Sequence, residues 1–207
     1  VVRSSTPAAD KRTPAGGAPT APHSADEAHE PRIDIDAVGA MLRGTWGETR
    51  LTVRELLKDP AYWRVDGQSV AEHRERVMGQ VRLLAKNSGS TRALPKEYGG
   101  DEDNGANLAG FEELVVADPS MQIKAGVQWG LFGSAVLQLG TKEHHDRWIP
   151  DIRDAKLPGA FAMTEIGHGS DVAAIGTTAT YDPETEEFVI HTPFRAAWKD
   201  YLGNAAV

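Results

Sequence analysis

The sequence predicts an α+β fold, in which an N-terminal helical domain over residues 33–158 precedes the beginning of an antiparallel β domain over residues 159–207. Capping signals and apolar residues at helical spacing recur through the first range. After Leu157-Pro158-Gly159 the pattern changes to short runs rich in Thr, Val, Ile and aromatic residues, which is typical of strands.

Residues 1–32 differ from both domains, because Ala, Pro, Gly, Ser and Thr dominate them and five of the chain's 12 prolines lie there. Such a segment buries too little apolar surface to offset the entropy lost on ordering. We expect a disordered tail, and favour an inert tail over a docking motif.

Two helix starts carry a capping box, in which a Ser or Thr and a Glu three residues later satisfy free N–H groups. One is Thr52-Val53-Arg54-Glu55, and Pro60 stops the helix that follows it. The other is Ser69-Val70-Ala71-Glu72, whose helix ends at Asn87-Ser88-Gly89.

A further helix is predicted by apolar residues that share one face: Leu108, Phe111, Leu114 and Val115. Asp118-Pro119 closes it and opens the next helix, with Asp as the N-cap and Pro in the first turn.

The helix expected over 119–139 is apolar on nearly all sides, which is typical of a buried helix. Its small residues, such as Gly126 and Gly130, admit either a neighbouring backbone or a long thin ligand, and both interpretations stay open. A short helix from Thr141 to Pro150 follows.

In the second range, Ala160 to Thr164 is expected to form a strand. Thr177 to Tyr181 and Phe188 to Thr192 flank a turn sequence and predict a hairpin. Arg195 to Tyr201 is expected to form one more strand. A two-stranded hairpin is marginal alone, so we expect an incomplete sheet.

Composition excludes several classes of protein. The net charge of −8 argues against a nucleic-acid partner, although backbone N–H groups can still bind anions. The absence of cysteine excludes disulfides, thiolate metal sites and Cys nucleophiles. The most apolar stretch, 125–139, is interrupted by Gln and too short to cross a bilayer, and no signal peptide is seen. We expect a cytoplasmic protein without a membrane span.

The segment Phe161-Ala162-Met163-Thr164-Glu165-Ile166-Gly167-His168-Gly169-Ser170 has the composition of a ligand loop. Its glycines permit a ligand close to the backbone, and Thr164 and Ser170 add hydroxyl groups. This suits a polar, partly anionic cofactor, while an ordinary turn explains the spacing alone equally well. No metal site is predicted, because the neighbours His144 and His145 do not share a helix face.

The run FAMTE followed by GHGSDV resembles the flavin-binding signature of the acyl-CoA dehydrogenase and oxidase superfamily. Its continuation, TTATYDPETEEFVIHTP, resembles the acyl-CoA oxidase branch. The stretches LPKEYGG, FEELVVADPS and IKAGVQWGLFG agree with it in collinear order. The resemblance implies a middle β domain and C-terminal helical domains after the helical domain, so that this chain is truncated before the latter.

The resemblance also implies FAD as cofactor and places the site residues. Thr164 hydrogen-bonds the flavin ring, and Ser170 lies where acyl-CoA and flavin meet, as a substrate-binding residue as well. Gly203 is the best match to a further flavin-contacting glycine, although Asp200-Tyr201-Leu202-Gly203-Asn204 departs from the usual Trp-Trp-Pro-Gly-Gly. The cofactor-binding residues implied are Phe161, Met163, Thr164, Gly169, Ser170 and Gly203.

The implied chemistry is α,β-desaturation of a fatty acyl-CoA by FAD, with electrons passed to oxygen to give hydrogen peroxide. The family's catalytic Glu base lies in the C-terminal helical domain, beyond Val207, so no catalytic residue is assigned and Glu165 is expected to be structural. The isolated chain is expected to be inactive, and the full-length protein a homodimer. A peroxisomal location would apply to a eukaryotic relative.

Two other functions remain open from the sequence. The first is an acyl-CoA dehydrogenase that passes its electrons to a flavoprotein acceptor. The second is a non-catalytic fragment or interaction module.

Overall fold

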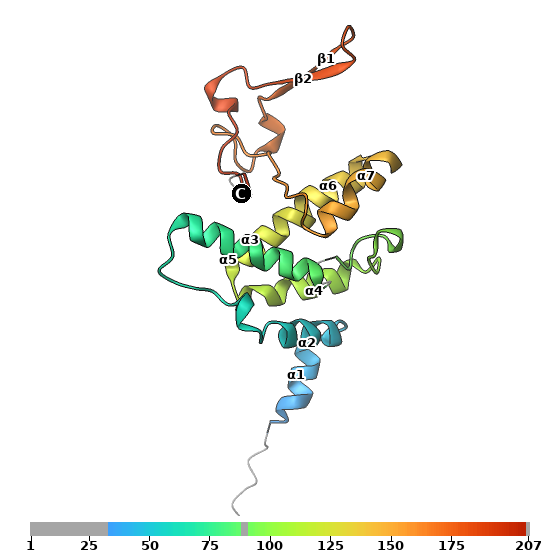
Figure 1. Ribbon diagram of the computed structural model, residues 1–207, viewed down its shortest axis with the longest axis vertical. Helices are drawn as coiled ribbons and strands as arrows, with labels where there is room; N and C mark the ends of the chain where they lie inside the picture. The colour runs from blue at the N-terminus through green and yellow to red at the C-terminus, as the bar shows by residue number, and fades with distance from the viewer. Residues whose placement is uncertain (1–32, 88–90, 206–207) are drawn as a thin grey trace, which may run out of the picture. The chain divides into compact units, whose positions relative to one another are not determined.

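The computed structural model describes residues 33–87 and 91–205 (Figure 1). The tail expected over 1–32 therefore lies outside the described residues. The chain divides into two units, 1–39 and 40–207. Helix α1 (Ile35–Arg43) begins in the first unit and buries none of its side chains.

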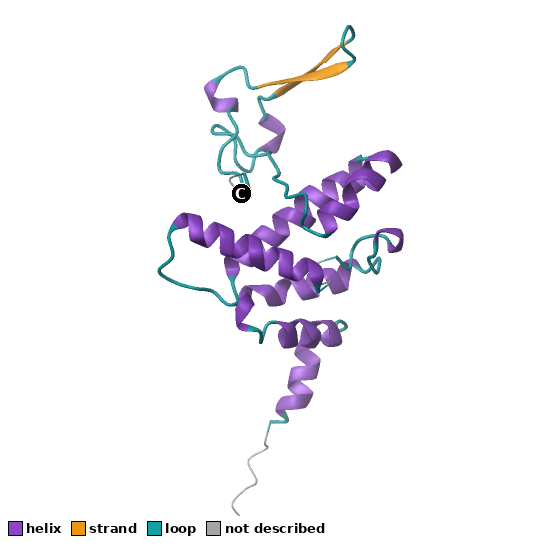
Figure 2. Ribbon diagram, in the orientation of Figure 1, coloured by secondary structure: helices purple, strands orange, loops and turns teal. Residues whose placement is uncertain are grey.

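The second unit holds six further α-helices in its described residues (Figure 2). These are α2 (Gly47–Leu56), α3 (Val70–Lys86), α4 (Asn104–Glu113), α5 (Pro119–Ala125), α6 (Ser134–Leu139) and α7 (Lys142–Arg153). Their core is made of large side chains that are less than 2% exposed, each contributing about 1.5–3 kcal/mol by its burial. Among them are Tyr62, Val81, Leu84, Leu114, Met121, Ile149 and Ile152.

The capping box at Ser69 is confirmed. The Ser69 hydroxyl accepts a hydrogen bond from the Glu72 backbone N–H at 3.3 Å, and the Glu72 carboxylate accepts one from the Ser69 N–H at 2.8 Å. The prediction of a capping box at Thr52 is wrong, because α2 begins at Gly47 and Thr52 lies inside this helix. There the Thr52 hydroxyl donates to the Glu48 carbonyl at 2.9 Å, which satisfies it within the helix. Val53, buried in the core, holds this longer helix in place.

The segment 119–139 is less regular than expected. Asp118 caps α5 as predicted, accepting from the Ser120 N–H at 2.9 Å, but a π-helix over Gly126–Gly133 separates α5 from α6. The expectation of burial on all sides is wrong, since Ile123 and Leu139 are 62% and 86% exposed. The reason is that α3 and α7 pack against only part of this segment's surface.

Helix α7 continues past Pro150, where the sequence predicted its end. Proline has no N–H to donate, so it removes one helical hydrogen bond. Ile149 and Ile152 on either side of it are 0% and 1% exposed. Their burial in the core holds the helix together to Arg153.

After α7 the only strands in the described residues form the predicted hairpin, which Figure 2 shows in orange. Strands β1 (Thr178–Asp182) and β2 (Glu187–His191) pair antiparallel, with Tyr181 opposite Phe188. The fold class is thus confirmed as a helical domain followed by a two-stranded antiparallel sheet.

The two other expected strands are absent from this part of the chain. Residues 160–164 have no ladder partner, and 195–201 contain a short 3₁₀ turn, Arg195–Ala197. A strand requires a partner backbone along its length. In the described part of these segments, the strand-like pairing is limited to isolated bridges of Glu165 with His168 and with Lys199.

Candidate functional site

The loop over 161–170 is anchored at its start by a buried glutamine of the π-helix. Gln128 is 1% exposed, and its amide oxygen accepts from the Gly159 N–H at 2.9 Å. Its amide nitrogen donates to the carbonyl oxygens of Ile152 at 3.2 Å and Leu157 at 2.8 Å. Both ends of the side chain are therefore used to join the helices to the loop.

Gly159 is required at this junction. A Cβ on residue 159 would lie 1.8 Å from a ring carbon of Phe132, which is far inside van der Waals contact. The loop can therefore leave the helices at this point only because the residue has no side chain.

The centre of the loop is a buried carboxylate, Glu165, which is 1% exposed. It accepts hydrogen bonds from the Gly176 N–H at 2.8 Å, the Thr177 N–H at 3.0 Å and the Thr177 hydroxyl at 2.6 Å. Lys199 Nζ lies 3.1 Å from the same carboxylate. Burial by itself raises the pKa of Glu165, but these donors outweigh it and hold the pKa at about 2.

Further backbone bonds fasten the loop to residues 196–199. The Ile166 N–H donates to the Trp198 carbonyl at 2.9 Å, and the Gly167 N–H donates to the Ala196 carbonyl at 2.8 Å. A Cβ on residue 167 would lie 2.8 Å from the Ala196 side chain, so this close approach depends on glycine.

The contacts of Glu165 are structural, because they join the loop to residues 176, 177 and 199. A carboxylate with four donors around it and a pKa of about 2 stays ionised at neutral pH. It is also sealed from any substrate by its burial. It is therefore unsuited to removing a substrate proton.

The predicted site residues on either side of Glu165 are accessible. Thr164 and Phe161 are half-buried, whereas Met163, Gly169 and Ser170 are exposed. Within the described part of the chain, neither the Thr164 hydroxyl nor the Ser170 hydroxyl has a hydrogen-bond partner. Thus the loop buries its charge and leaves two hydroxyl groups free to contact a ligand.

Gly203 lies in a different setting from the other five. It lines an open cleft of about 420 Å³ with residues of α3 and α5, and none of the other five lines that cleft. The Asn204 amide holds this segment by donating to the carbonyl oxygens of Lys124 at 3.3 Å and Gly159 at 3.2 Å. The structure therefore groups five predicted residues on one loop and places Gly203 apart.

Sequence reasoning missed the residues that shape this loop: Gln128, Thr177 and Lys199. One signal was available in the sequence. Glu165 lies among largely apolar residues, and a carboxylate that is buried needs a hydrogen-bonding or charged partner. The identity of that partner was not readable, since Lys199 is far from Glu165 along the chain.

Residues 48–156 match the family described as Acyl-CoA dehydrogenase, N-terminal domain. The chain belongs to this family. Among curated relatives, acyl-coenzyme A oxidase 3, peroxisomal, from Arabidopsis thaliana is 42% identical over 139 residues, which are 67% of this chain and 20% of that protein. Acyl-coenzyme A oxidase 2, peroxisomal, from the same plant is 36% identical over 202 residues. The match covers 94% of this chain and 28% of that protein.

Solved structures of acyl-CoA oxidases have the same fold. Acyl-CoA oxidase3 from Yarrowia lipolytica superposes with a TM-score of 0.65 at 31% identity, over 83% of this chain and 24% of that one. Acyl-CoA oxidase1 from the same yeast superposes with a TM-score of 0.66 at 26% identity, over 82% of this chain and 24% of that one. The family member described here thus spans 20% to 28% of the length of the first two curated relatives.

Two further properties of the described residues bear on function. None of their helices combines the length and the apolar character needed to cross a bilayer. No group of three or more His, Asp or Glu side chains in them is arranged to hold a metal ion.

Proposed function

We propose that this chain acts in the FAD-dependent α,β-desaturation of fatty acyl-CoA, with electrons passed to oxygen, as part of an acyl-CoA oxidase. The observation that carries the proposal is the arrangement of the loop, where buried Glu165 lies between Thr164 and Ser170, whose hydroxyls are unpartnered in the described residues. The oxidase names of the relatives support the choice of reaction.

The residues present fit a flavin. The half-buried Thr164 hydroxyl can donate to a polar atom of the ring, and the exposed residues Met163 and Gly169 leave room for the ring to approach. Ser170, exposed at the end of the loop, would contact both the cofactor and the acyl-CoA. FAD, when bound, supplies the acceptor for the substrate's β hydrogen and its electron pair.

Proton removal needs a group that this loop does not provide. Glu165, with its pKa of about 2, is the only carboxylate between residues 161 and 170, and it is already occupied by four donors. We therefore place no catalytic base in this loop and propose that the 207 residues alone do not turn over acyl-CoA. An assay in air with added FAD, following enoyl-CoA and hydrogen peroxide formed from palmitoyl-CoA, tests this, and turnover by the chain alone would contradict it.

Flavin binding is tested by titrating the purified chain with FAD and following flavin fluorescence. Thr164→Val removes one hydroxyl while keeping the shape, and we expect affinity to fall about ten-fold. Thr180→Val is the matched control, because Thr180 is exposed on β1, and its affinity should equal that of the unaltered chain. Absence of saturable binding, or an equal loss in both variants, would count against the proposal.

The dehydrogenase alternative is favoured by one observation, the dehydrogenase description of the matching family. It predicts the same desaturation but a flavoprotein as electron acceptor. Hydrogen peroxide formed in air by the active enzyme would support the oxidase, and turnover that requires an added electron acceptor would support the dehydrogenase.

A further inference from the structure

The cleft that contains Gly203 has a basic lining. It lies between α3, α5 and residues 202–205, with a volume of about 420 Å³. Its charged and polar side chains are His73, Arg74, Ser120, Lys124 and Asn204. Val77, Ile123 and Leu202 supply an apolar wall, so the cleft combines positive charge with apolar surface.

Arg74 and Lys124 are the two permanent cations of the cleft. No Asp or Glu lines it, and neither Arg74 nor Lys124 forms an ion pair with another residue in the ranges 33–87 and 91–205. Partial burial and the nearby charge of Arg74 lower the pKa of Lys124. The repulsion between two like charges that are close together is reduced when an anion lies between them.

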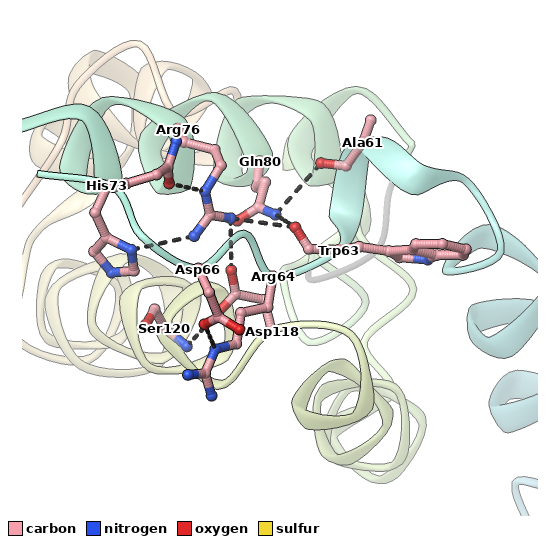
Figure 3. A network of polar contacts seen from close by, with 10 residues as sticks. Ala61, Trp63, Arg64, Asp66, His73, Arg76, Gln80, Asp118 and Ser120 are labelled. Carbon is pink, nitrogen blue, oxygen red and sulfur yellow. Dashed lines mark hydrogen bonds and ion pairs between the residues drawn. The ribbon is translucent and has the colours of Figure 1, made fainter.

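Arg76 lies two residues after Arg74 on α3 and, unlike Arg74, has a carboxylate partner among the described residues, as Figure 3 shows. Its guanidinium donates to the Asp118 carboxylate at 2.7 Å, and Asp118 is only 1% exposed. Its charge is therefore neutralised within the fold. This contrast separates a structural arginine from Arg74, which faces the cleft.

Arg76 also orients the histidine of the cleft. Arg76 Nη2 lies 3.1 Å from His73 Nδ1, and because a guanidinium can only donate, Nδ1 must accept. The proton of the neutral ring is then on Nε2. His73 thereby gains a fixed N–H donor beside the two cations.

We propose that this cleft binds a phosphate-bearing organic anion, with Arg74 and Lys124 donating to the phosphate oxygens and the apolar wall contacting the organic part. The net charge of −8 makes general attraction of anions unfavourable, so binding requires a local site of this kind. The identity of the ligand rests on the proposed function, because FAD and CoA both carry a diphosphate.

The test is calorimetric titration of the full 207-residue chain with inorganic pyrophosphate. We expect Arg74→Gln and Lys124→Gln each to weaken binding about ten-fold, as loss of a charge-assisted hydrogen bond should. Arg82→Gln is the matched control, since Arg82 is exposed on the same helix and lies outside the cleft. The proposal is overturned if the unaltered chain does not bind pyrophosphate, or if Arg82→Gln weakens binding as much as the other two.

Two further titrations identify the source of the phosphate. If the cleft holds the FAD diphosphate, pyrophosphate displaces FAD and Arg74→Gln weakens FAD binding. If it holds the phosphates of CoA, pyrophosphate displaces CoA and leaves FAD in place. Flavin fluorescence on the same samples separates the two proposals: FAD binding without any pyrophosphate site refutes the cleft alone, whereas a pyrophosphate site without FAD binding refutes the flavin site alone.

Discussion

Lys199 Nζ lies 3.1 Å from the buried carboxylate of Glu165 and 2.9 Å from the carbonyl oxygen of Met163. One ammonium group thus bonds both to the side chain and to the backbone of the proposed flavin loop. Lys199 and Met163 are 36 residues apart in sequence, so this contact joins the loop to the segment that follows the hairpin. The accessible Thr164 lies between the two groups that Lys199 holds.

Replacing Glu165 by Gln should destabilise this region. The amide keeps the shape but removes the charge that faces Lys199, and its NH₂ group meets donors at Gly176 and Thr177. We expect the melting temperature to fall by roughly 3–8 °C. Glu187→Gln, on exposed β2, should leave melting unchanged. Equal melting of the Glu165 variant and the unaltered chain would show that the pair is dispensable.

The same pair should make stability depend on pH. The pKa of Glu165 is about 2 in the folded chain, against an ordinary value of 4.5. A lowered pKa means that the stabilisation is fully present above pH 4.5 and is lost as the pH falls toward 2. The gap in urea-unfolding free energy between the unaltered chain and Glu165→Gln should therefore narrow over this window. A constant gap would contradict the assigned ionisation.

Glu113 should matter more than its neighbour Glu112. Its side chain is 6% exposed and accepts from Arg54 at 2.7 Å and from Arg50 at 3.1 Å, and the Arg54 hydrogen bond is the main cause of its lowered pKa. Arg54 is half exposed, so solvent screens part of the interaction. Glu113→Gln should lower the free energy of unfolding by about 1–2 kcal/mol.

Glu112→Gln is the control for that measurement, with the same change of charge at an adjacent position. Glu112 is 52% exposed, and Arg50 is its one ion-pair partner among the described residues, so we expect a loss of about 0.5 kcal/mol or less. Comparable losses in the two variants, measured by urea unfolding, would refute the distinction.

Gln128→Leu should loosen the junction between the helices and the loop. The change leaves the Gly159 N–H and the Leu157 carbonyl without their buried partner, at a cost of about 2 kcal/mol. Hydrogen exchange at the Gly159 amide should accelerate. Gln138→Leu, at an exposed position on α6, should leave that exchange rate unaltered. Unchanged protection in the Gln128 variant would mean that other contacts hold the junction.

Features that depend on hydrogen bonds or patterns between residues near each other in the chain could be predicted from the sequence. The Ser69–Glu72 box, the Asp118 cap and the β1–β2 hairpin are of this kind, because each depends on a short local pattern. The family was readable for a related reason, since its motifs are contiguous runs of residues. The structural role of Glu165 followed from that resemblance rather than from local chemistry.

Tertiary structure alone decided the features whose partners lie far along the chain. Core burial carried α7 past Pro150, and the lack of a ladder partner left residues 160–164 outside any strand. The contacts of Lys199 with Glu165 and the approach of Arg74 to Lys124 likewise join distant segments. A local pattern specifies which groups need a partner, but only the packed chain determines which distant group comes within bonding distance.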